Sequence, residues 1–363
     1  MDNKLCLKIP QGPYGAVKFY GKEIEKYRKK NSIQLEDQLT FSIDVDGNNF
    51  SGKRIVYLWS SYTNLGEKMK GLCASDCIVT RDDETKRFLE KRMNLYSHVL
   101  PMFGLKSKKI KKFEERKIPV FFPGSYLEEH STLSNIEKVY PKVMCDIAIG
   151  SIRWMEKEKN YHLGSGICSY LSQEGIEYSE DMIYSYLEIY GYLVEDYIRR
   201  KLRNQIINIL LKSQIPVHVC GANWNILYEK LDASEQKYLY VHGQNLSIEA
   251  ISDLMANSKV VLNISPNLHG GLHERVTMAM INGAICVTDE NDYILEEFQN
   301  RNVVELFSFA HLKNLPGRIK KILCNEEEWK VRSEHAIQMA NSTYTVENFW
   351  NQICEWSGTK TYK

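Results

Sequence analysis

Residues 260–289 have the sequence VVLNISPNLHGGLHERVTMAMINGAICVTD, and this stretch decides the fold. It opens with an apolar run long enough for a buried strand, followed by a polar loop with two glycines and two histidines. Apolar residues then recur at helical spacing up to Asn282 and Gly283, a pair suited to a helix C-terminus, and a second apolar run follows. The pattern predicts a strand, a loop, a helix and another strand.

The loop in this stretch is the first place to look for chemistry. In an open parallel sheet, ligands bind at the loop after a strand's carboxyl end, and the next helix directs its positive end at them. The candidate residues by this argument are His269, Gly270, Gly271, His273, Glu274 and Arg275.

Composition limits the function classes. The 363 residues suffice for about two domains, and 43% apolar and 26% charged residues are ordinary for a globular protein. Lys and Arg number 47 against 46 Asp and Glu, so the net charge of +1 gives no steering toward nucleic acid or an anionic membrane. We see neither a signal-peptide core nor an apolar run of about 20 residues, and we therefore expect a cytoplasmic protein without a transmembrane segment.

The pattern along the chain predicts an α/β protein with two Rossmann-like domains facing a cleft. Short strands and helices alternate over residues 1–117, which we expect to form the acceptor-side domain. Residues 106–118 are basic and poor in apolar residues, which favours a solvated linker over a phosphate-binding or lipid-surface patch. Residues 118–350 would form the second domain, including a tyrosine-rich helical region at 134–212, and 351–363 a C-terminal helix and tail.

Two apolar runs, IPVHVC and YLYVH, stop at Gly221 and Gly243, as expected for strands that turn sharply into ligand-facing loops. Asn223 and Trp224 follow the first glycine, where a nucleobase or ribose could lie, although core packing also explains Trp224. His242 precedes the second glycine and is a further candidate at a strand end.

Taken in order, PGSY, VCGANW, VHG, VLNIS and the arginine of HERV resemble the nucleotide-sugar-binding half of GT-B glycosyltransferases, in the branch related to the spore maturation protein CgeB. The resemblance covers residues 119–292 apart from the helical region. It implies a metal-independent glycosyltransferase with no cofactor beyond its donor, which would be a UDP-linked sugar. The acceptor would be a glycan, a peptide or a small molecule, and the near-zero net charge leads us to expect no nucleic-acid partner.

The resemblance assigns a role to the loop. Backbone N–H groups of Gly270 and Gly271 and the helix N-terminus would approach the donor diphosphate, and Arg275 would hold its oxygen atoms. His269 and His273 would donate hydrogen bonds to phosphate or sugar, with simple structural contacts as the alternative. The spacing HGGLHE does not match the zinc signature HExxH, so we expect no metal there.

One departure concerns the nucleotide ribose. Met278 stands where the family usually has a glutamate that holds the ribose hydroxyls, and the first glutamate of the commoner Glu-x7-Glu pattern would fall at Gly270. Glu274 or Glu290 could take over this contact.

The acceptor side is predicted from chemistry alone. The loop containing Gln11, Gly12, Tyr14 and Gly15 would face the cleft. An inverting enzyme needs a general base, and the aspartates that fit are Asp44, Asp46 and Asp82. The Asp-x-Asp of DVDG also has the form of a metal-binding motif, but a turn at Asp46-Gly47 explains it adequately.

The leading hypothesis is therefore a glycosyltransferase, with Arg275, His273 and Asp44 as its catalytic residues. The alternative is a non-catalytic nucleotide-sugar-binding or interaction protein on a degenerate GT-B fold, because Met278 replaces the expected glutamate. A dinucleotide-dependent oxidoreductase has little support, since no Rossmann glycine fingerprint follows any strand.

Overall fold

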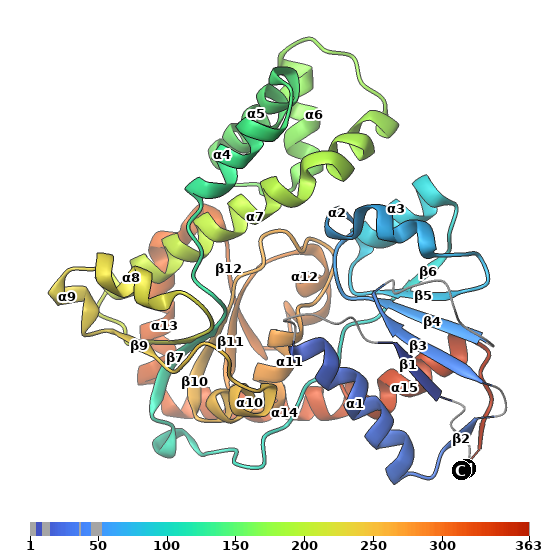
Figure 1. Ribbon diagram of the computed structural model, residues 1–363. Coiled ribbons are helices and arrows are strands. Elements are labelled where there is room, and N and C mark those ends of the chain that lie inside the picture. The colour runs from blue at the N-terminus through green and yellow to red at the C-terminus, as the bar shows by residue number, and fades with distance from the viewer. Residues whose placement is uncertain (1–4, 9–14, 36–37, 45–52, 363) are drawn as a thin grey trace.

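The computed structural model describes residues 5–8, 15–35, 38–44 and 53–362. It contains two parallel sheets, each covered by helices, and a helical arm that rises above both of them (Figure 1). The prediction of an α/β protein with two Rossmann-like domains is therefore confirmed. None of the helices in these ranges is long and apolar enough to span a bilayer.

The first sheet has five parallel strands in the order β1-β3-β4-β5-β6. Its central strands are buried, which explains their nearly continuous apolar sequence. The strands are β1 (Leu5–Lys8), β3 (Leu39–Ile43), β4 (Lys53–Leu58), β5 (Cys77–Thr80) and β6 (Ser97–Val99), and the helices of this domain are α1 (Gly15–Lys30), α2 (Tyr62–Leu65) and α3 (Asp83–Met93).

The second sheet has six parallel strands in the order β12-β11-β10-β7-β8-β9. They are β7 (Ile118–Pro123), β8 (Val217–Cys220), β9 (Leu239–Val241), β10 (Ser258–Asn263), β11 (Ile285–Asp289) and β12 (Val304–Phe307). The helices around it are α8 (Trp224–Lys230), α9 (Ala233–Gln236), α10 (Ile248–Ala256), α11 (Glu274–Ile281), α12 (Asp292–Phe298), α13 (Leu315–Cys324) and α14 (Glu326–Thr343). Strands are added first on one side of β7 and then on the other, so the sheet has a topological switch point between β7 and β10.

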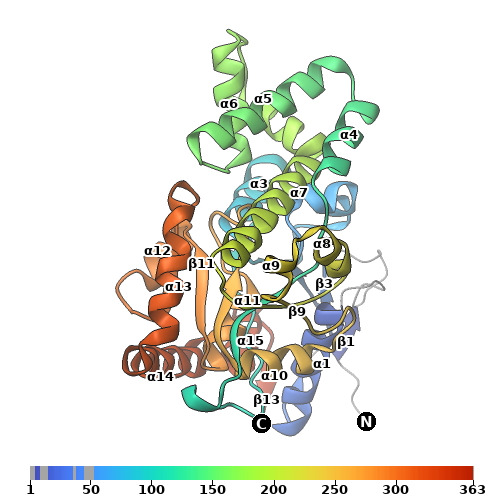
Figure 2. The ribbon, with the colours of Figure 1, turned by 90° about the vertical axis from the view of Figure 1, so that its left-hand side faces the viewer.

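The helical arm is an insertion between β7 and β8. It consists of α4 (His130–Val139), α5 (Lys142–Glu158), α6 (Leu163–Gln173) and α7 (Glu180–Lys212). With 33 residues, α7 is about 50 Å long. Its first half shares a hydrophobic core with α2 and α3 of the first domain, and its last turns pack in the core of the second sheet. The arm therefore bridges the two domains (Figure 2).

The C-terminal segment returns to the first sheet. Helix α15 (Val346–Trp356) places the ring of Phe349 5.5 Å from that of Tyr57 on β4, measured between centroids. Beyond it, β13 (Thr361–Tyr362) pairs antiparallel with β2 (Gln34–Leu35). The helix begins at Val346, before the range 351–363 expected for a C-terminal helix and tail, and its apolar side chains belong to the core between the two domains.

Candidate functional site

Arg275 lies at the switch point of the second sheet. It is the second residue of α11, and its side chain is buried. Its Nε donates a hydrogen bond to the carbonyl oxygen of Pro123 at 3.1 Å, and Nη1 donates to Oδ1 of Asn263 at 2.6 Å. Since Pro123 ends β7 and Asn263 ends β10, the guanidinium joins the carboxyl ends of the two strands between which ligands bind in such folds.

His273 starts the helix that carries Arg275. Its ring Nδ1 accepts a hydrogen bond from the backbone N–H of Arg275 at 3.2 Å, which caps α11. Burial and the nearby guanidinium groups of Arg275 and Arg81 hold the pKa of His273 well below its usual value. A carboxylate oxygen of Glu274 lies 3.1 Å from the same nitrogen, but a neutral ring forms no ion pair with it. The structure therefore gives His273 a capping role at the edge of the site.

A second arginine reaches the same edge from α7. Nε and one terminal nitrogen of Arg203 both lie 3.2 Å from the carbonyl oxygen of Ile264. The guanidinium carbons of Arg203 and Arg275 lie 5.7 Å and 5.4 Å from the ring centroid of Phe122, so the two cations share one aromatic side chain. Sequence reasoning missed Arg203 because α7 looked like packing material. The feature of the sequence that could have indicated Arg203 is the basic segment RRKLR, residues 199–203, which precedes the strand run IPVHVC.

The charges at this edge favour an anion. Burial and the neighbouring cations Arg199 and Arg275 hold the pKa of Arg203 well below its usual value. In the described part of the chain, the hydrogen-bond partners of Arg203 and Arg275 are neutral oxygen atoms. Asp289 is buried nearby, and burial raises its pKa to about 6 although Ser265 N–H donates to it at 2.8 Å. Neither cation is paired with a carboxylate among the described residues, so a bound anion would stabilise the buried Arg275 and the half-buried Arg203.

The glycine loop before α11 touches the first domain. The backbone N–H of Asp83 donates to the carbonyl oxygen of Gly270 at 2.9 Å, and Gly271 forms an antiparallel bridge with Asp82. A Cβ atom on Gly271 would lie 2.3 Å from the carbonyl oxygen of Arg81. The absence of a side chain at Gly271 is therefore required by the domain contact, and phosphate binding by the two glycines stays a prediction.

The residues predicted after β8 have clear structural roles. Trp224 is buried, and its Nε1 donates to the carbonyl oxygen of Gly124 at 2.7 Å, in agreement with the core-packing alternative. Gly221 has φ +121°, and a Cβ there would come within 2.8 Å of the backbone of Gly124. Asn223 has a left-handed backbone conformation, with φ +67°, and directly precedes α8. These residues hold the β7 and β8 loops together at the carboxyl edge.

The remaining predicted donor residues spread along the edge of the second sheet. His242 is exposed, and its Nε2 lies 2.8 Å from Nδ1 of His218. Gly243 has φ +137°, a conformation that favours glycine. Glu290 is exposed directly after β11, whereas Met278 is only 2% exposed and belongs to the core.

Two aspartates considered as general bases are engaged in holding the backbone. Asp44 has φ +55°, and one of its carboxylate oxygens accepts hydrogen bonds from the N–H groups of Trp59 and Ser60 at 2.8 Å and 2.9 Å. Asp82 caps α3 by accepting from Thr85 N–H at 2.8 Å. Gly15 is the first residue of α1, while Gln11, Gly12, Tyr14 and Asp46 lie outside the described residues.

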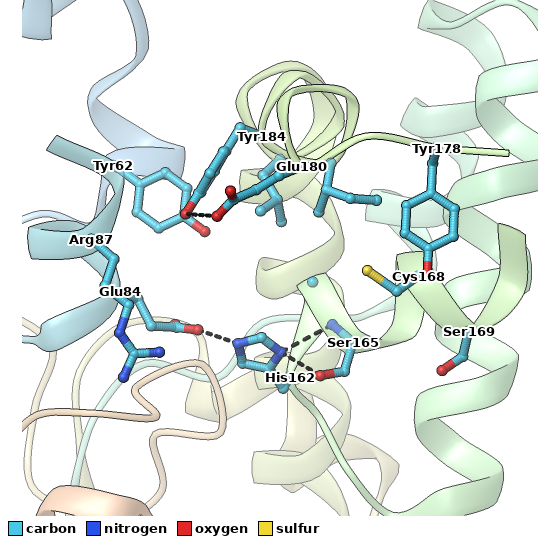
Figure 3. Close-up of a pocket in the computed structure, with 13 residues that line it drawn as sticks. Tyr62, Glu84, Arg87, His162, Ser165, Cys168, Ser169, Tyr178, Glu180 and Tyr184 are labelled. Atoms are coloured by element: carbon cyan, nitrogen blue, oxygen red, sulfur yellow. Dashed lines mark hydrogen bonds and ion pairs between the residues drawn. The ribbon is translucent and has the colours of Figure 1, made fainter. Parts of the chain in front are cut away.

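A cavity of about 530 Å³ opens between α3 of the first domain and α6 and α7 of the arm (Figure 3). At its wall, Nε2 of His162 contacts a carboxylate oxygen of Glu84. The ring of His162 lies 4.9 Å from that of His269, which belongs to the glycine loop. Glu195 on α7 accepts from Thr63 Oγ1 at 2.8 Å, and burial raises its pKa to about 8. Sequence reasoning had not singled out Glu84, His162 or Glu195.

Solved structures with the same fold identify the architecture. Sucrose-phosphate synthase from Thermosynechococcus elongatus superposes with a TM-score of 0.51 at 10% identity, over 96% of this chain and 78% of that one. The chain has the GT-B glycosyltransferase fold. HepE from Anabaena, solved with UDP and glucose, superposes with a TM-score of 0.50 at 12% identity, over 95% of this chain and 83% of HepE. A glycosyltransferase from Rickettsia africae superposes with a TM-score of 0.50 at 9% identity, over 97% of this chain and 98% of that one.

Sequence comparison adds one match on this GT-B chain. Residues 199–355 match the family model described as "Glycosyl transferase-like", and no curated protein matches the sequence. The matched segment begins at Arg199 in α7 and continues through α15, so it contains Arg203 and Arg275 and all but one strand of the second sheet. The sequence match therefore falls on the half of the GT-B fold that holds both arginines.

Proposed function

We propose that this protein transfers a sugar from a nucleoside diphosphate donor, UDP-linked, to an acceptor hydroxyl without a metal ion. The observation that carries the proposal is the pair of guanidinium groups at the switch point of the second sheet, the buried one of Arg275 and the half-buried one of Arg203. The glycosyl transferase-like match over residues 199–355 supports the reaction class. The UDP and glucose bound to HepE, which shares this fold, support the choice of donor.

The chemistry follows from where charge develops. As the bond between the sugar and the diphosphate breaks, negative charge grows on the leaving phosphate oxygens. Arg275 and Arg203 donate to neutral oxygens, so these contacts do not cancel the positive charge offered to the leaving group, and the two side chains need little rearrangement. The N-terminus of α11, which begins at Glu274, adds partial positive charge. In this scheme the guanidinium groups supply the charge stabilisation that a metal provides in other transferases.

The ribose contact has to differ from that of related enzymes. Met278 faces the core, so the position of the usual glutamate cannot hold a hydroxyl group here. Glu290 is exposed at the carboxyl end of β11, and Glu274 stands at the start of α11, 3.9 Å from Arg81. We propose Glu290 for the ribose, because Glu274 is already engaged by a cation. The CgeB-like assignment, carried by the segments PGSY and VCGANW, is likewise part of this proposal.

The decisive experiment is calorimetric titration of the protein with UDP, GDP, ADP, CDP and TDP. UDP should bind saturably, and Arg275→Ala should weaken it by about tenfold or more, because a charge-assisted bidentate contact contributes about 1.5–3 kcal/mol. Arg301→Ala is the matched control, since Arg301 is exposed in the turn after α12 and pairs with Glu297. The proposal would be refuted by the absence of binding heat for all five nucleotides.

The second candidate is a nucleotide-sugar-binding protein without catalytic activity, which the missing glutamate at Met278 favours. Both candidates predict UDP binding, so only turnover separates them. Incubation with UDP-glucose, UDP-galactose and UDP-N-acetylglucosamine should release UDP slowly even without an acceptor. Mass spectrometry that finds all three donors intact after prolonged incubation, with UDP binding preserved, would favour the binding protein.

A further inference from the structure

The cavity beneath the helical arm is lined by residues of the first domain and by residues of the arm. Tyr62 and Glu84 come from the first domain, and His162 and Tyr184 come from the arm (Figure 3). Tyr62 stacks on Phe88 with 4.6 Å between ring centroids, and Phe88 in turn meets the edge of Tyr184 at 5.6 Å. The volume of the cavity, about 530 Å³, is within the range of roughly 300–1,000 Å³ typical of small-molecule sites.

Glu84 is held as an oriented carboxylate at the wall of this cavity. One of its oxygens contacts Nε2 of His162, and its side chain is 19% exposed. On the other side of the ring, Nδ1 accepts from Ser165 N–H at 3.0 Å and lies 2.8 Å from Ser165 Oγ. An Nδ1 that accepts a backbone N–H carries no proton, so the ring proton is on Nε2 and points at Glu84. Burial alone would raise the pKa of Glu84, but the hydrogen bond from His162 and the nearby His269 bring it below the usual value.

The cavity is next to the proposed donor site. Glu84 is the second residue of α3, directly after Asp83, whose N–H donates to Gly270 in the glycine loop. The same loop contributes His269, whose ring lies 4.9 Å from that of His162. Helix α11 begins at Glu274, four residues after Gly270. A ligand in the cavity and a diphosphate at Arg275 would therefore be separated by this one loop.

We propose that this cavity is the acceptor site and that it binds a pyranose carbohydrate, with Glu84 accepting a hydrogen bond from one of its hydroxyl groups. The inference rests on the proposed function and adds the acceptor class to it. Tyrosine rings offer flat apolar surfaces to the C–H face of a sugar ring, while Glu84, Arg87 and Ser169 offer acceptors and donors for its hydroxyls. His162 is a positioning residue that orients Glu84.

The test uses saturation-transfer NMR with maltose, cellobiose, lactose and chitobiose as probes. Wild-type protein should bind at least one of them. Ser169→Trp fills the cavity and should abolish the signal, and Glu84→Gln should weaken binding about tenfold through loss of a charged acceptor. Lys157→Trp, on an exposed position of the same arm, and Glu90→Gln, on the exposed side of α3, are the matched controls and should bind like wild type. Thermal unfolding checks that each variant is folded.

UDP titration of the same variants separates this inference from the proposed function. Unchanged UDP affinity in Ser169→Trp, together with lost disaccharide binding, is the expected result. The acceptor proposal is overturned if no disaccharide binds to wild type, or if Ser169→Trp and Glu84→Gln bind as wild type does. Disaccharide binding that depends on Ser169 and Glu84 in a protein that binds no nucleotide would refute the donor proposal and leave the carbohydrate site standing.

Discussion

The guanidinium of Arg275 is held by the side-chain oxygen of Asn263, at 2.6 Å, and this oxygen belongs to a neutral amide. A carboxylate at the same position would form a buried ion pair and cancel the charge that we propose for diphosphate binding. Asn263 is itself buried, and its Nδ2 donates to Thr288 Oγ1 at 2.9 Å, which fixes the amide orientation. The second sheet thus positions a buried cation without neutralising it.

Asn263→Asp should therefore weaken UDP binding while leaving the fold intact. The new carboxylate has the same shape and would pair with Arg275, so we expect at least a tenfold loss of UDP affinity. Calorimetry measures the affinity and urea unfolding measures the stability. Asn257→Asp, at the end of α10 and away from the site, serves as the control. Equal affinity in Asn263→Asp and wild type would contradict the assigned role of the arginine charge.

Gly271→Ala should lower stability through the domain contact. The added Cβ would lie 2.3 Å from the carbonyl oxygen of Arg81, so the backbones must separate, at a cost of about 1–3 kcal/mol. Gly317→Ala is the matched control, because nothing lies within 4 Å of its Cβ position in α13 and alanine favours a helix by up to about 1 kcal/mol. Urea denaturation should thus shift the two midpoints in opposite directions. A Gly271→Ala midpoint equal to wild type would show that the loop does not pack on the first domain.

Asp44→Asn should leave sugar transfer nearly unchanged. The amide oxygen can still accept from the N–H groups of Trp59 and Ser60, and asparagine tolerates the left-handed conformation at φ +55°. We expect a stability loss of about 1 kcal/mol, from replacement of a charged acceptor by a neutral one. A fall in kcat by about 10²–10⁴ without loss of folding would instead identify Asp44 as the general base.

Asp289 should make stability depend on pH between about 4 and 6. Burial raises its pKa from 3.8 to about 6, so the folded protein holds this proton more tightly than the unfolded chain does. This contribution is complete below pH 4 and is lost as pH rises through 6, a change of about 3 kcal/mol. Asp289→Asn removes the titration and keeps an acceptor for Ser265 N–H. The difference between the two urea-unfolding profiles over pH 4–7 should show this slope, and parallel profiles would contradict it.

Local sequence determined most of the elements and the fold class. Apolar runs of strand length predicted β8, β9, β10 and β11, and helical spacing of apolar residues predicted α11. Arg275 was found because the residue at the start of a helix after a buried strand has a predictable place in a parallel sheet. These signals are short in range, and the energies behind them act within a few residues.

Only the tertiary structure decided which side chains meet at the site. Arg203 and Arg275 are 72 positions apart in sequence and share Phe122, because the insertion between β7 and β8 sends α7 across the sheet edge. Glu84 and His162 meet for the same reason, since the arm packs on the first domain through buried side chains of α7. Hydrophobic burial is non-directional along the chain, so helical periodicity could show that the arm has an apolar face but not which surface it covers.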